Sequence, residues 1–451
     1  MKRIVLIQPL YQNEKLDRNV RTVFPNGLGY LAAYVPDHWD VRILDEQIQP
    51  IDFDMAVDVA GISTTTLTAT RAYEIGDEFR KRGKTVFMGG VHATVLPDEA
   101  AEHADAICLG DGELVIADML RDYERGCLKK TYRNTPDHIA GLKHPRRDLF
   151  AGRYTFMPVS TSRGCPFNCS FCAINRFYEG KYRKRPVDDV IEEFKALPPG
   201  HDLVFVTDGN MYGYLPEDVS RFREICARLA EERRKGNLAF KHFTCYGSIN
   251  ALDDDEALDL ARQAGCIAIL VGFESINPSS LKEMGKSLNL KYGVETYRKL
   301  VAKAKRHKLL VVGEMLVGND ADDMDTLRRT EAFIDDIGFD ILRLQIVQPL
   351  PGTRLFEKLQ AEDRLLLKNF PEDWNKLRDS FLVGVHFRLK QLNAKELQGW
   401  VKRVGLAFYR PDRIVRRVWS NYRTSGSVRL ALVTMLLNWK SRKSYANLEI
   451  E

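Results

Sequence analysis

Three cysteines lie within eight residues of one another, and their spacing suggests metal chemistry. The stretch TSRGCPFNCSFC places Cys165, Cys169 and Cys172 in a C-x₃-C-x₂-C arrangement, in a chain that has only eight cysteines. Thiolates at such spacing can hold zinc, form a redox pair or hold an iron–sulfur cluster. The loop is rich in Gly, Pro, Asn and Ser, which is a poor setting for three buried structural cysteines.

The number of cysteines distinguishes between these sites. Structural zinc takes four ligands, usually as two pairs, and no second pair follows, although His201 or His242 could supply a fourth ligand. A redox pair uses two cysteines and leaves Cys165 without a role. A [4Fe–4S] cluster held by three thiolates keeps one iron open to bind a small molecule. We therefore predict an iron–sulfur site.

The same stretch resembles the signature of the radical S-adenosylmethionine (SAM) superfamily, C-x₃-C-x-aromatic-C, at every position, with Phe171 as the aromatic residue. The resemblance implies that Cys165, Cys169 and Cys172 hold a [4Fe–4S] cluster whose open iron chelates the methionine end of SAM. One-electron reduction, from a donor such as flavodoxin or ferredoxin, then yields a 5′-deoxyadenosyl radical. The protein positions this cofactor and excludes water.

Two later segments resemble strand ends with which the superfamily contacts SAM. VTDGN lies where the methionine amine is held, which implicates Asp208. GFESIN resembles the strand end that meets the ribose hydroxyls; it implicates Glu274, because a carboxylate pairs well with a diol, and Ser275. The alternative for Asp208 and Glu274 is a turn cap or a surface charge. Arg183 and Arg185, after the cluster loop, either are solvated or neutralise the cluster.

The elements that must position these residues alternate between strand and helix from residue 156 to about 350. Six strand–helix units predict a partial parallel (β/α)6 barrel, short of the eight units of a closed one. The cysteine loop follows the first strand, at the carboxyl-end rim where barrel enzymes do chemistry. Residues 131–155 are predicted to be a linker, and residues 351–451 a helical, basic C-terminal region.

Residues 1–130 also alternate short apolar strands with helices, which predicts a doubly wound parallel sheet. Ligands bind such sheets at the carboxyl ends of the strands. A doubly wound domain before a radical-SAM barrel resembles the cobalamin-binding (B12-binding) subgroup. That resemblance implies bound cobalamin, with Gly61, Ser63, Gly89 and Gly90 lining the groove for its nucleotide tail.

One departure from cobalamin folds concerns the cobalt ligand. Many such folds carry D-x-H-x-x-G after the first strand, and this segment has no histidine. His92 lies after a later strand, the wrong place for an axial ligand. The subgroup often binds cobalamin without a protein ligand to cobalt, so we expect cobalamin here. The alternative is a domain that only shapes the substrate cavity.

The positive charge of the chain is concentrated at its end. The net charge is +5, and residues 401–451 hold eleven Lys or Arg against three Asp or Glu. The stretch VRLALVTMLLNWKSRK sets an apolar run with Trp439 beside basic residues. It either packs on the barrel or contacts a membrane surface peripherally. Without an aromatic–basic platform, no nucleic-acid partner is expected. Lacking a signal peptide or a span of about 18 apolar residues, the chain is expected in the cytoplasm, either free or peripherally bound at the inner membrane face.

Together these features predict an enzyme that methylates an unactivated carbon of a small or lipophilic substrate. A second SAM would methylate cobalamin, and S-adenosylhomocysteine would be a product. The alternative within the family is a non-methylating radical reaction, such as cyclisation, oxidation or addition of an adenosyl group. An RNA-binding protein is less favoured because most of the chain is near neutral. An electron-transfer protein is less favoured because it would need four cluster ligands.

Overall fold

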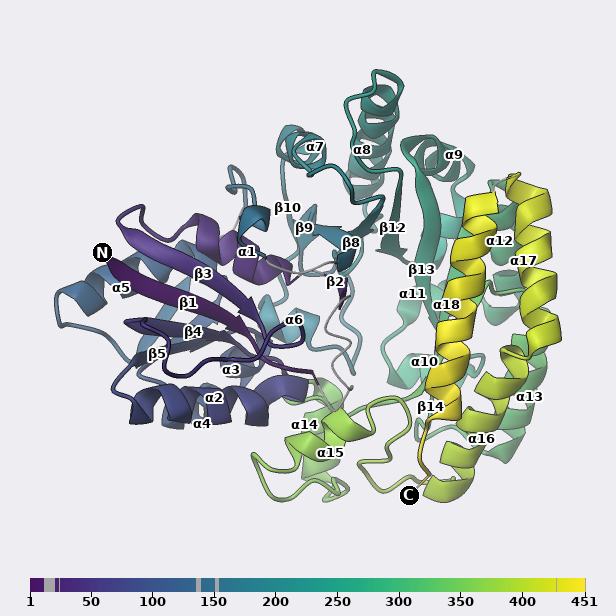
Figure 1. Cartoon of the computed structure of the whole chain (residues 1–451). Helices are drawn as coiled ribbons and strands as arrows, with labels where there is room; N and C mark the ends of the chain where they lie inside the picture. Colours follow the sequence, from purple (N-terminus) through teal and green to yellow (C-terminus); the bar gives the residue numbers. More distant parts are fainter. Residues whose placement is uncertain (12–20, 24, 135–138, 151–153, 427, 451) are drawn as a thin grey trace.

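The computed structural model describes residues 1–11, 21–23, 25–134, 139–150, 154–426 and 428–450. Two parallel sheets lie side by side, and a set of C-terminal helices packs against both (Figure 1). This arrangement confirms the predicted class, an α/β protein with a doubly wound sheet, a half-barrel and a helical C-terminal region.

The first sheet is parallel throughout, with the strand order β3-β1-β4-β5-β6-β7. Residues of β1 point alternately to two hydrophobic clusters, Ile4 and Leu6 to one and Val5 and Ile7 to the other. Burial on both faces explains why these strands are continuous apolar runs. The strands are β1 (Lys2–Gln8), β3 (Trp39–Asp45), β4 (Val59–Ser63), β5 (Thr85–Gly89), β6 (Ala106–Gly110) and β7 (Thr131–Asn134).

Helices cover both faces of this sheet. They are α1 (Asn26–Ala33), α2 (Ala69–Lys81), α3 (Val91–Val95), α4 (Pro97–Glu102) and α5 (Ile116–Glu124). The buried residues of α1 and α5 join the cluster on one face, and those of α2, α3 and α4 join the cluster on the other (Figure 1). The carboxyl ends of the strands stay free of helices and face the second sheet.

The second sheet is an open parallel half-barrel with the order β15-β14-β13-β12-β11-β8-β2. Six of its strands are the six predicted between residues 156 and 350. They are β8 (Tyr154–Val159), β11 (Leu203–Val206), β12 (His242–Gly247), β13 (Cys266–Glu274), β14 (Leu310–Val317) and β15 (Ile341–Ile346).

Two short strands cross the predicted domain boundaries. β2 (Arg21–Val23) comes from the N-terminal region but pairs with β8 of the half-barrel, with Val23 opposite Phe156. β7 lies in the predicted linker and extends the first sheet by one strand. Neither segment has the alternating apolar pattern that predicts a strand. Each is an edge strand that forms by pairing with the neighbouring strand of its sheet. The boundaries themselves remain predictions.

Helices on the outside of the half-barrel bury its largest core. They are α7 (Val187–Lys195), α8 (Pro216–Arg234), α9 (Asp255–Ala264), α12 (Tyr297–Arg306) and α13 (Met324–Asp336). Short helices α6 (Ile174–Phe177), α10 (Pro278–Glu283) and α11 (Ser287–Tyr292) lie in the connections that leave the carboxyl ends of strands. Those connections carry the candidate site.

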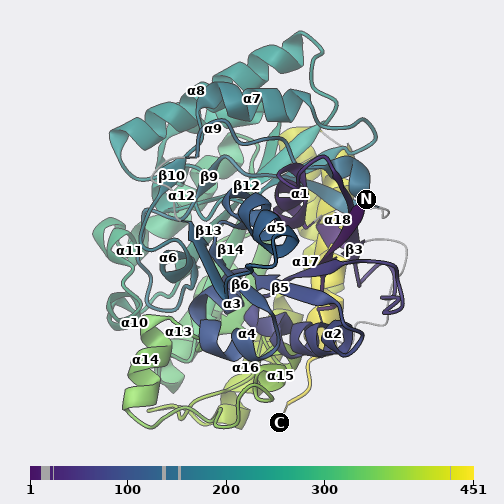
Figure 2. The same cartoon turned by 90° about the vertical axis from the view of Figure 1, so that its left-hand side faces the viewer.

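The C-terminal helices divide between the two sheets. They are α14 (Arg354–Ala361), α15 (Trp374–Asp379), α16 (Ala394–Phe408), α17 (Pro411–Ser425) and α18 (Val428–Ala446). Phe356 of α14 and Trp374 of α15 share a core with the first sheet, next to α2 and α4 (Figure 2). Helices α16 and α18 pack beside β15. Helix α17 packs against α18 (Figure 1).

Two tyrosines close the free edge of β15, the last strand of the half-barrel. The Tyr409 hydroxyl accepts from the Leu342 N–H (2.9 Å) and donates to the Leu342 carbonyl (2.7 Å). The Tyr445 hydroxyl does the same at Leu344 (2.9 and 3.0 Å). An edge strand otherwise exposes such groups to pairing with another chain.

Removing either hydroxyl should destabilise the protein. We expect Tyr409→Phe and Tyr445→Phe each to lower the free energy of unfolding by about 1–3 kcal/mol, because a buried N–H and a buried carbonyl lose their partner. Urea unfolding followed by circular dichroism measures the change. Tyr422→Phe, at an exposed position of α17, is the matched control and should have no effect. Equal midpoints for all three variants would contradict this account.

Candidate functional site

The cysteine loop leaves the carboxyl end of β8 and is closed at its base by a short antiparallel ladder. In this ladder β9 (Ser162–Arg163) pairs with β10 (Arg183–Lys184). Gly164 begins the loop with a φ of +87°, and a Cβ there would lie 2.0 Å from the Lys181 carbonyl oxygen. Only glycine fits that turn without displacing the backbone. The ladder therefore closes the base of the loop that carries the three cysteines, at the carboxyl ends of the half-barrel strands.

Asp208 fixes the start of this loop and does not line a cavity. Its carboxylate accepts from the Thr161 N–H (2.7 Å), the Thr161 hydroxyl (2.5 Å) and the Ser162 hydroxyl (2.7 Å). Burial raises the pKa of Asp208, although these hydrogen bonds act against the increase. The contact of Asp208 with SAM stays a prediction, and in this structure its carboxylate oxygens bind Thr161 and Ser162. Its neighbours Thr207 and Gly209 line the cavity instead.

The far side of the loop is held by α10 and α14. The Ser170 N–H donates to the Met284 carbonyl (2.9 Å), and the Ser170 carbonyl accepts from the Leu355 N–H (2.9 Å). Within the loop, Asn175 Nδ2 donates to the Phe167 carbonyl (2.9 Å). The two hydrogen bonds of Ser170 connect the loop to residues more than 100 positions later in the chain, so the shape of the loop depends on the complete fold.

The three thiols lie close enough to influence one another electrostatically. Burial raises the pKa of Cys165 to about 12, and it also raises the pKa values of Cys169 and Cys172. The Lys286 ammonium acts in the opposite direction on all three. Buried thiols beside a cation suit thiolate ligation, in which bound iron compensates the negative charge.

The geometry fits a cluster better than a single metal ion. Among the described residues, no three His, Cys, Asp or Glu side chains converge as they would around one ion. In a [4Fe–4S] cluster each thiolate binds a different iron, so convergence on one point is not required. His201 and His242 cannot complete a zinc site, because they lie at the amino ends of β11 and β12, opposite the cysteine loop.

A cavity of about 620 Å³ opens beside the cysteines, at the carboxyl ends of the half-barrel strands. Cys172, Phe171 and Glu274 line it, as the sequence predicts. Glu274 ends β13 with a φ of +62°, a conformation that favours glycine, and its Oε1 lies 3.1 Å from Lys286 Nζ. A glutamate kept in such a conformation at a cavity wall suggests a functional constraint. Ser275 is buried and faces away from the cavity, with its hydroxyl accepting from the Asn277 N–H (3.0 Å).

The lining of this cavity also combines one polar cluster with apolar side chains. Arg343 Nη1 lies 2.9 Å from Glu314 and donates to the Tyr246 hydroxyl at 3.1 Å. All three line the cavity. The apolar lining includes Val91, Phe177, Met315, Leu316, Ile346, Leu350 and Phe381. Such a lining suits a largely apolar molecule that carries one polar group.

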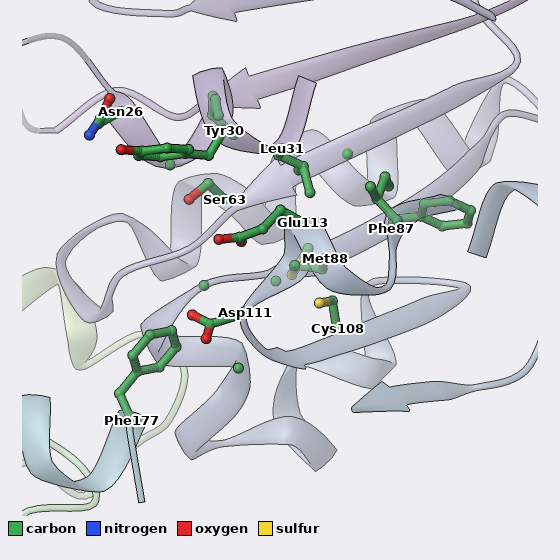
Figure 3. A pocket seen from close by; sticks show the side chains of 18 of the residues that line it. Asn26, Tyr30, Leu31, Ser63, Phe87, Met88, Cys108, Asp111, Glu113 and Phe177 are labelled. Atoms are coloured by element: carbon green, nitrogen blue, oxygen red, sulfur yellow. The ribbon is translucent and has the colours of Figure 1, made fainter. Parts of the chain in front are cut away.

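A second cavity, of about 280 Å³, lies at the carboxyl ends of the first sheet. Gly61, Ser63, Gly89 and Gly90 all line it, which places the predicted groove residues together. Figure 3 shows Tyr30, Ser63, Asp111 and Glu113 around this cavity, with Phe177 of α6 reaching toward it from the half-barrel. The cavity therefore lies between the two sheets.

The second cavity fits part of a corrinoid cofactor. Its rim holds Asn26, whose buried Oδ1 has no hydrogen-bond partner, and the amide side chains of cobalamin are donors that would satisfy it. No histidine among the described residues lines either cavity. His92 is fully buried, with its ring nitrogens 3.2 Å from Thr66 and 3.0 Å from Glu99. These contacts confirm that His92 is unsuited to a cobalt ligand.

The two cavities adjoin each other. They share five lining residues: Ser160, Arg163, Phe177, Tyr178 and Thr207. A ligand bound at the cysteine side and one bound at the first sheet would therefore lie next to each other.

A buried ionic joint connects the two sheets at this point. Arg163, at the base of the cysteine loop, pairs with Asp111 (2.8 Å) and Glu113, and Arg183 pairs with Asp111 (2.6 Å). All four side chains are less than one-tenth exposed. Arg183 thus neither points to solvent nor neutralises the cluster, because a carboxylate of the first sheet already balances its charge.

A second buried group lies next to this joint. Glu193 accepts from Tyr30 (2.8 Å) and Arg147 (2.5 Å) and pairs with Arg185. Arg185 is only 1% exposed, so it too is neither solvated nor directed at the cysteines. The cation that acts on the thiols is Lys286, which the sequence did not single out. The only feature in the sequence that could have indicated Lys286 is its position twelve residues after Glu274.

Comparison with known proteins assigns a family to each sheet. The model of the Radical SAM superfamily matches residues 159–331, which include the cysteine loop and strands β11 to β14 of the half-barrel. The model of the B12 binding domain matches residues 20–120, which include strands β3 to β6 of the first sheet. The two matches fall on the two regions that line the two cavities.

Relatives and solved structures cover most of the chain. Bacteriochlorophyllide d C-12(1)-methyltransferase of Chlorobaculum tepidum is 28% identical over 92% of this chain and 89% of its own length. Hopanoid C-2 methylase of Rhodopseudomonas palustris is 26% identical over 76% of this chain and 65% of its own. The methyltransferase TsrM from Kitasatospora setae, solved with cobalamin and a [4Fe–4S] cluster, has the same fold (TM-score 0.66, 17% identity, 82% of this chain and 80% of that one).

Breaking the ionic joint should destabilise the protein strongly. We expect Arg163→Met to lower the free energy of unfolding by about 3–5 kcal/mol, because it leaves the buried Glu113 without its partner and leaves Asp111 paired only with Arg183. Urea unfolding measures this loss. Arg146→Met, which removes an exposed pair with Asp148, is the matched control and should cost about 1 kcal/mol or less. Similar losses in the two variants would mean that the joint does not hold the sheets together.

Proposed function

Because this chain belongs to the radical SAM superfamily and carries an N-terminal B12-binding domain, we propose that it transfers a methyl group to an unactivated carbon of a lipophilic small molecule. One observation carries the proposal: the cavity beside the cysteines and the cavity at the first sheet adjoin each other and share five lining residues. Methyl transfer to a carbon radical requires the radical source and the methyl carrier to reach the same substrate.

In this proposal Cys165, Cys169 and Cys172 hold the cluster. When bound, the cluster with SAM supplies one-electron radical chemistry, and cobalamin supplies a methyl group. The protein contributes by holding the loop at Asp208, by providing the Lys286 cation beside the thiols and by enclosing the reaction in a cavity. Glu274 would accept hydrogen bonds from the ribose hydroxyls of SAM.

The residues of the first sheet would hold cobalamin without a protein ligand to the metal. Gly61, Gly89 and Gly90 leave the strand ends open to a bulky group, and Ser63 and Asn26 offer polar atoms to its amides. The shared residues Phe177 and Tyr178 lie between this groove and the cysteine side.

The substrate is proposed to be lipophilic with at least one polar group. The apolar lining of the larger cavity would bind the hydrocarbon part, and the cluster of Arg343, Glu314 and Tyr246 would orient the polar part. The relatives named for bacteriochlorophyllide and hopanoid methylation support this class. An electron donor of the flavodoxin or ferredoxin type would supply the reducing electron.

Anaerobic reconstitution tests the proposed function. The full chain is loaded with iron, sulfide, hydroxocobalamin and SAM and is then reduced. We expect about four irons per chain, retained cobalamin, and both 5′-deoxyadenosine and S-adenosylhomocysteine by mass spectrometry. Cys169→Ala should lose the iron and both products. Cys127→Ala, at an exposed cysteine away from the site, should keep them.

The outcomes separate the alternatives. 5′-Deoxyadenosine without S-adenosylhomocysteine would favour a non-methylating radical reaction. Iron without retained cobalamin would mean that the first sheet only shapes the cavity. Iron bound equally by Cys169→Ala and Cys127→Ala would refute the cluster assignment.

Glu274 can be tested separately from cluster assembly. We expect Glu274→Gln to weaken SAM binding about ten-fold or more, because a charged hydrogen bond contributes about 1.5–3 kcal/mol, while iron content stays unchanged. Equilibrium dialysis with labelled SAM measures the affinity. Glu372→Gln, at an exposed loop position, is the control. Unchanged SAM affinity in Glu274→Gln would remove this residue from the SAM site.

A further inference from the structure

The last two helices expose large apolar side chains in two stripes, which together we call the C-terminal apolar face. Its members are Val415, Trp419 and Tyr422 of α17 and Val428, Leu432, Met435, Leu436 and Trp439 of α18. The spacing on α17 is i, i+4, i+7, and that on α18 is i, i+4, i+7, i+8, i+11, so each set forms one helix stripe. Trp419 is 59% exposed, Leu436 64% and Trp439 48%.

The two stripes lie next to each other along a helical hairpin. α17 and α18 pack together as antiparallel neighbours joined by two residues (Figure 1). Positions equally far from the turn lie level with one another, so Trp419 lies within one residue of the level of Met435, and Val415 within one residue of the level of Trp439. Trp419 also contacts Tyr422, with ring centroids 5.9 Å apart. An apolar face of this kind on a folded protein marks an interaction site.

The exposed side chains are not needed to hold the hairpin in place, because the inner side of the hairpin already contacts the half-barrel. Asn438 donates to the Asp340 carbonyl (3.1 Å), Tyr445 closes β15, and Leu437 packs on the inner-facing residues of the half-barrel. α18 therefore carries apolar side chains on its outer side in addition to those that pack inward. Apolar side chains of a helix are normally buried.

The charge of the hairpin identifies the partner. α17 and α18 contain eight Lys or Arg and one Asp. Arg416, Arg423 and Lys443 are exposed on the same helices as the apolar stripes. Exposed tryptophans flanked by basic side chains are typical of helices that lie in the interface of an anionic membrane. A second copy of the chain would present the same positive charge and would be repelled.

We propose that the C-terminal apolar face docks this enzyme on the surface of an anionic lipid bilayer. The aromatic and aliphatic side chains enter the acyl boundary, and the basic side chains contact lipid headgroups. None of the described helices is long and apolar enough to cross a membrane, so the hairpin lies along the surface. This inference goes beyond the proposed reaction and does not depend on it.

Intrinsic tryptophan fluorescence reports on this face specifically. Of the five tryptophans, Trp39, Trp374 and Trp400 are buried. A blue shift on adding vesicles of phosphatidylglycerol and phosphatidylcholine must therefore come from Trp419 and Trp439. We expect this shift in the full chain, and we expect Trp419→Phe/Trp439→Phe to lose it while still sedimenting with the vesicles.

Cosedimentation measures the affinity. We expect Trp419→Ser/Trp439→Ser to bind anionic vesicles at least about ten-fold more weakly. Arg416→Gln/Arg423→Gln should bind about 25-fold more weakly, since each basic residue near the surface contributes about five-fold. High salt should weaken binding of the unaltered chain. Tyr214→Ser/Leu215→Ser, an exposed apolar pair before α8, is the matched control and should bind normally.

Three results would overturn the proposal. The first is no sedimentation of the unaltered chain with anionic vesicles. The second is equal binding by the Trp419→Ser/Trp439→Ser and Tyr214→Ser/Leu215→Ser variants, both shown to be folded by circular dichroism. The third is a dimer in light scattering that the Trp419→Ser/Trp439→Ser variant converts to a monomer without any vesicle binding, which would assign the face to self-association.

Discussion

The arrangement of the site depends on the buried ionic joint between the two sheets. Arg163 and Arg183 form the base of the cysteine loop, and Asp111 and Glu113 follow β6 of the first sheet. Buried charges must be balanced, so the two sheets can approach only in the orientation that brings these groups together. The joint therefore fixes the position of the cysteine loop relative to the groove of the first sheet.

Both sheets are parallel, and this explains why their ligand sites meet. In a parallel sheet all carboxyl ends lie at one edge, and polar loops gather there. The joint sets the two carboxyl-end edges against each other, and the two cavities share lining residues such as Ser160 and Thr207. Two cofactors and a substrate could thus lie side by side between the sheets, while each sheet keeps its own hydrophobic core.

An open half-barrel leaves an edge strand, and the C-terminal helices resolve this problem. Tyr409 and Tyr445 satisfy the free backbone groups of β15, and α16 and α18 cover the edge. The sequence indicated that this region is helical and basic, but it did not indicate which side of α18 would be buried. Because α18 carries apolar residues on more than one side, only its packing shows that the outer stripe with Trp439 is left exposed.

The sequence by itself determined the strand and helix order, the cysteine motif and the glycine-lined ends of the first sheet, because periodicity and motif spacing are local properties. The tertiary structure alone decided the partners of charged residues. Asp208 turned out to anchor the loop at Thr161, and Arg183 pairs with a carboxylate 72 positions earlier. Lys286 reaches the thiols from more than 100 residues away. Such pairings depend on which strand ends are brought together in space, and no local pattern in the chain encodes that.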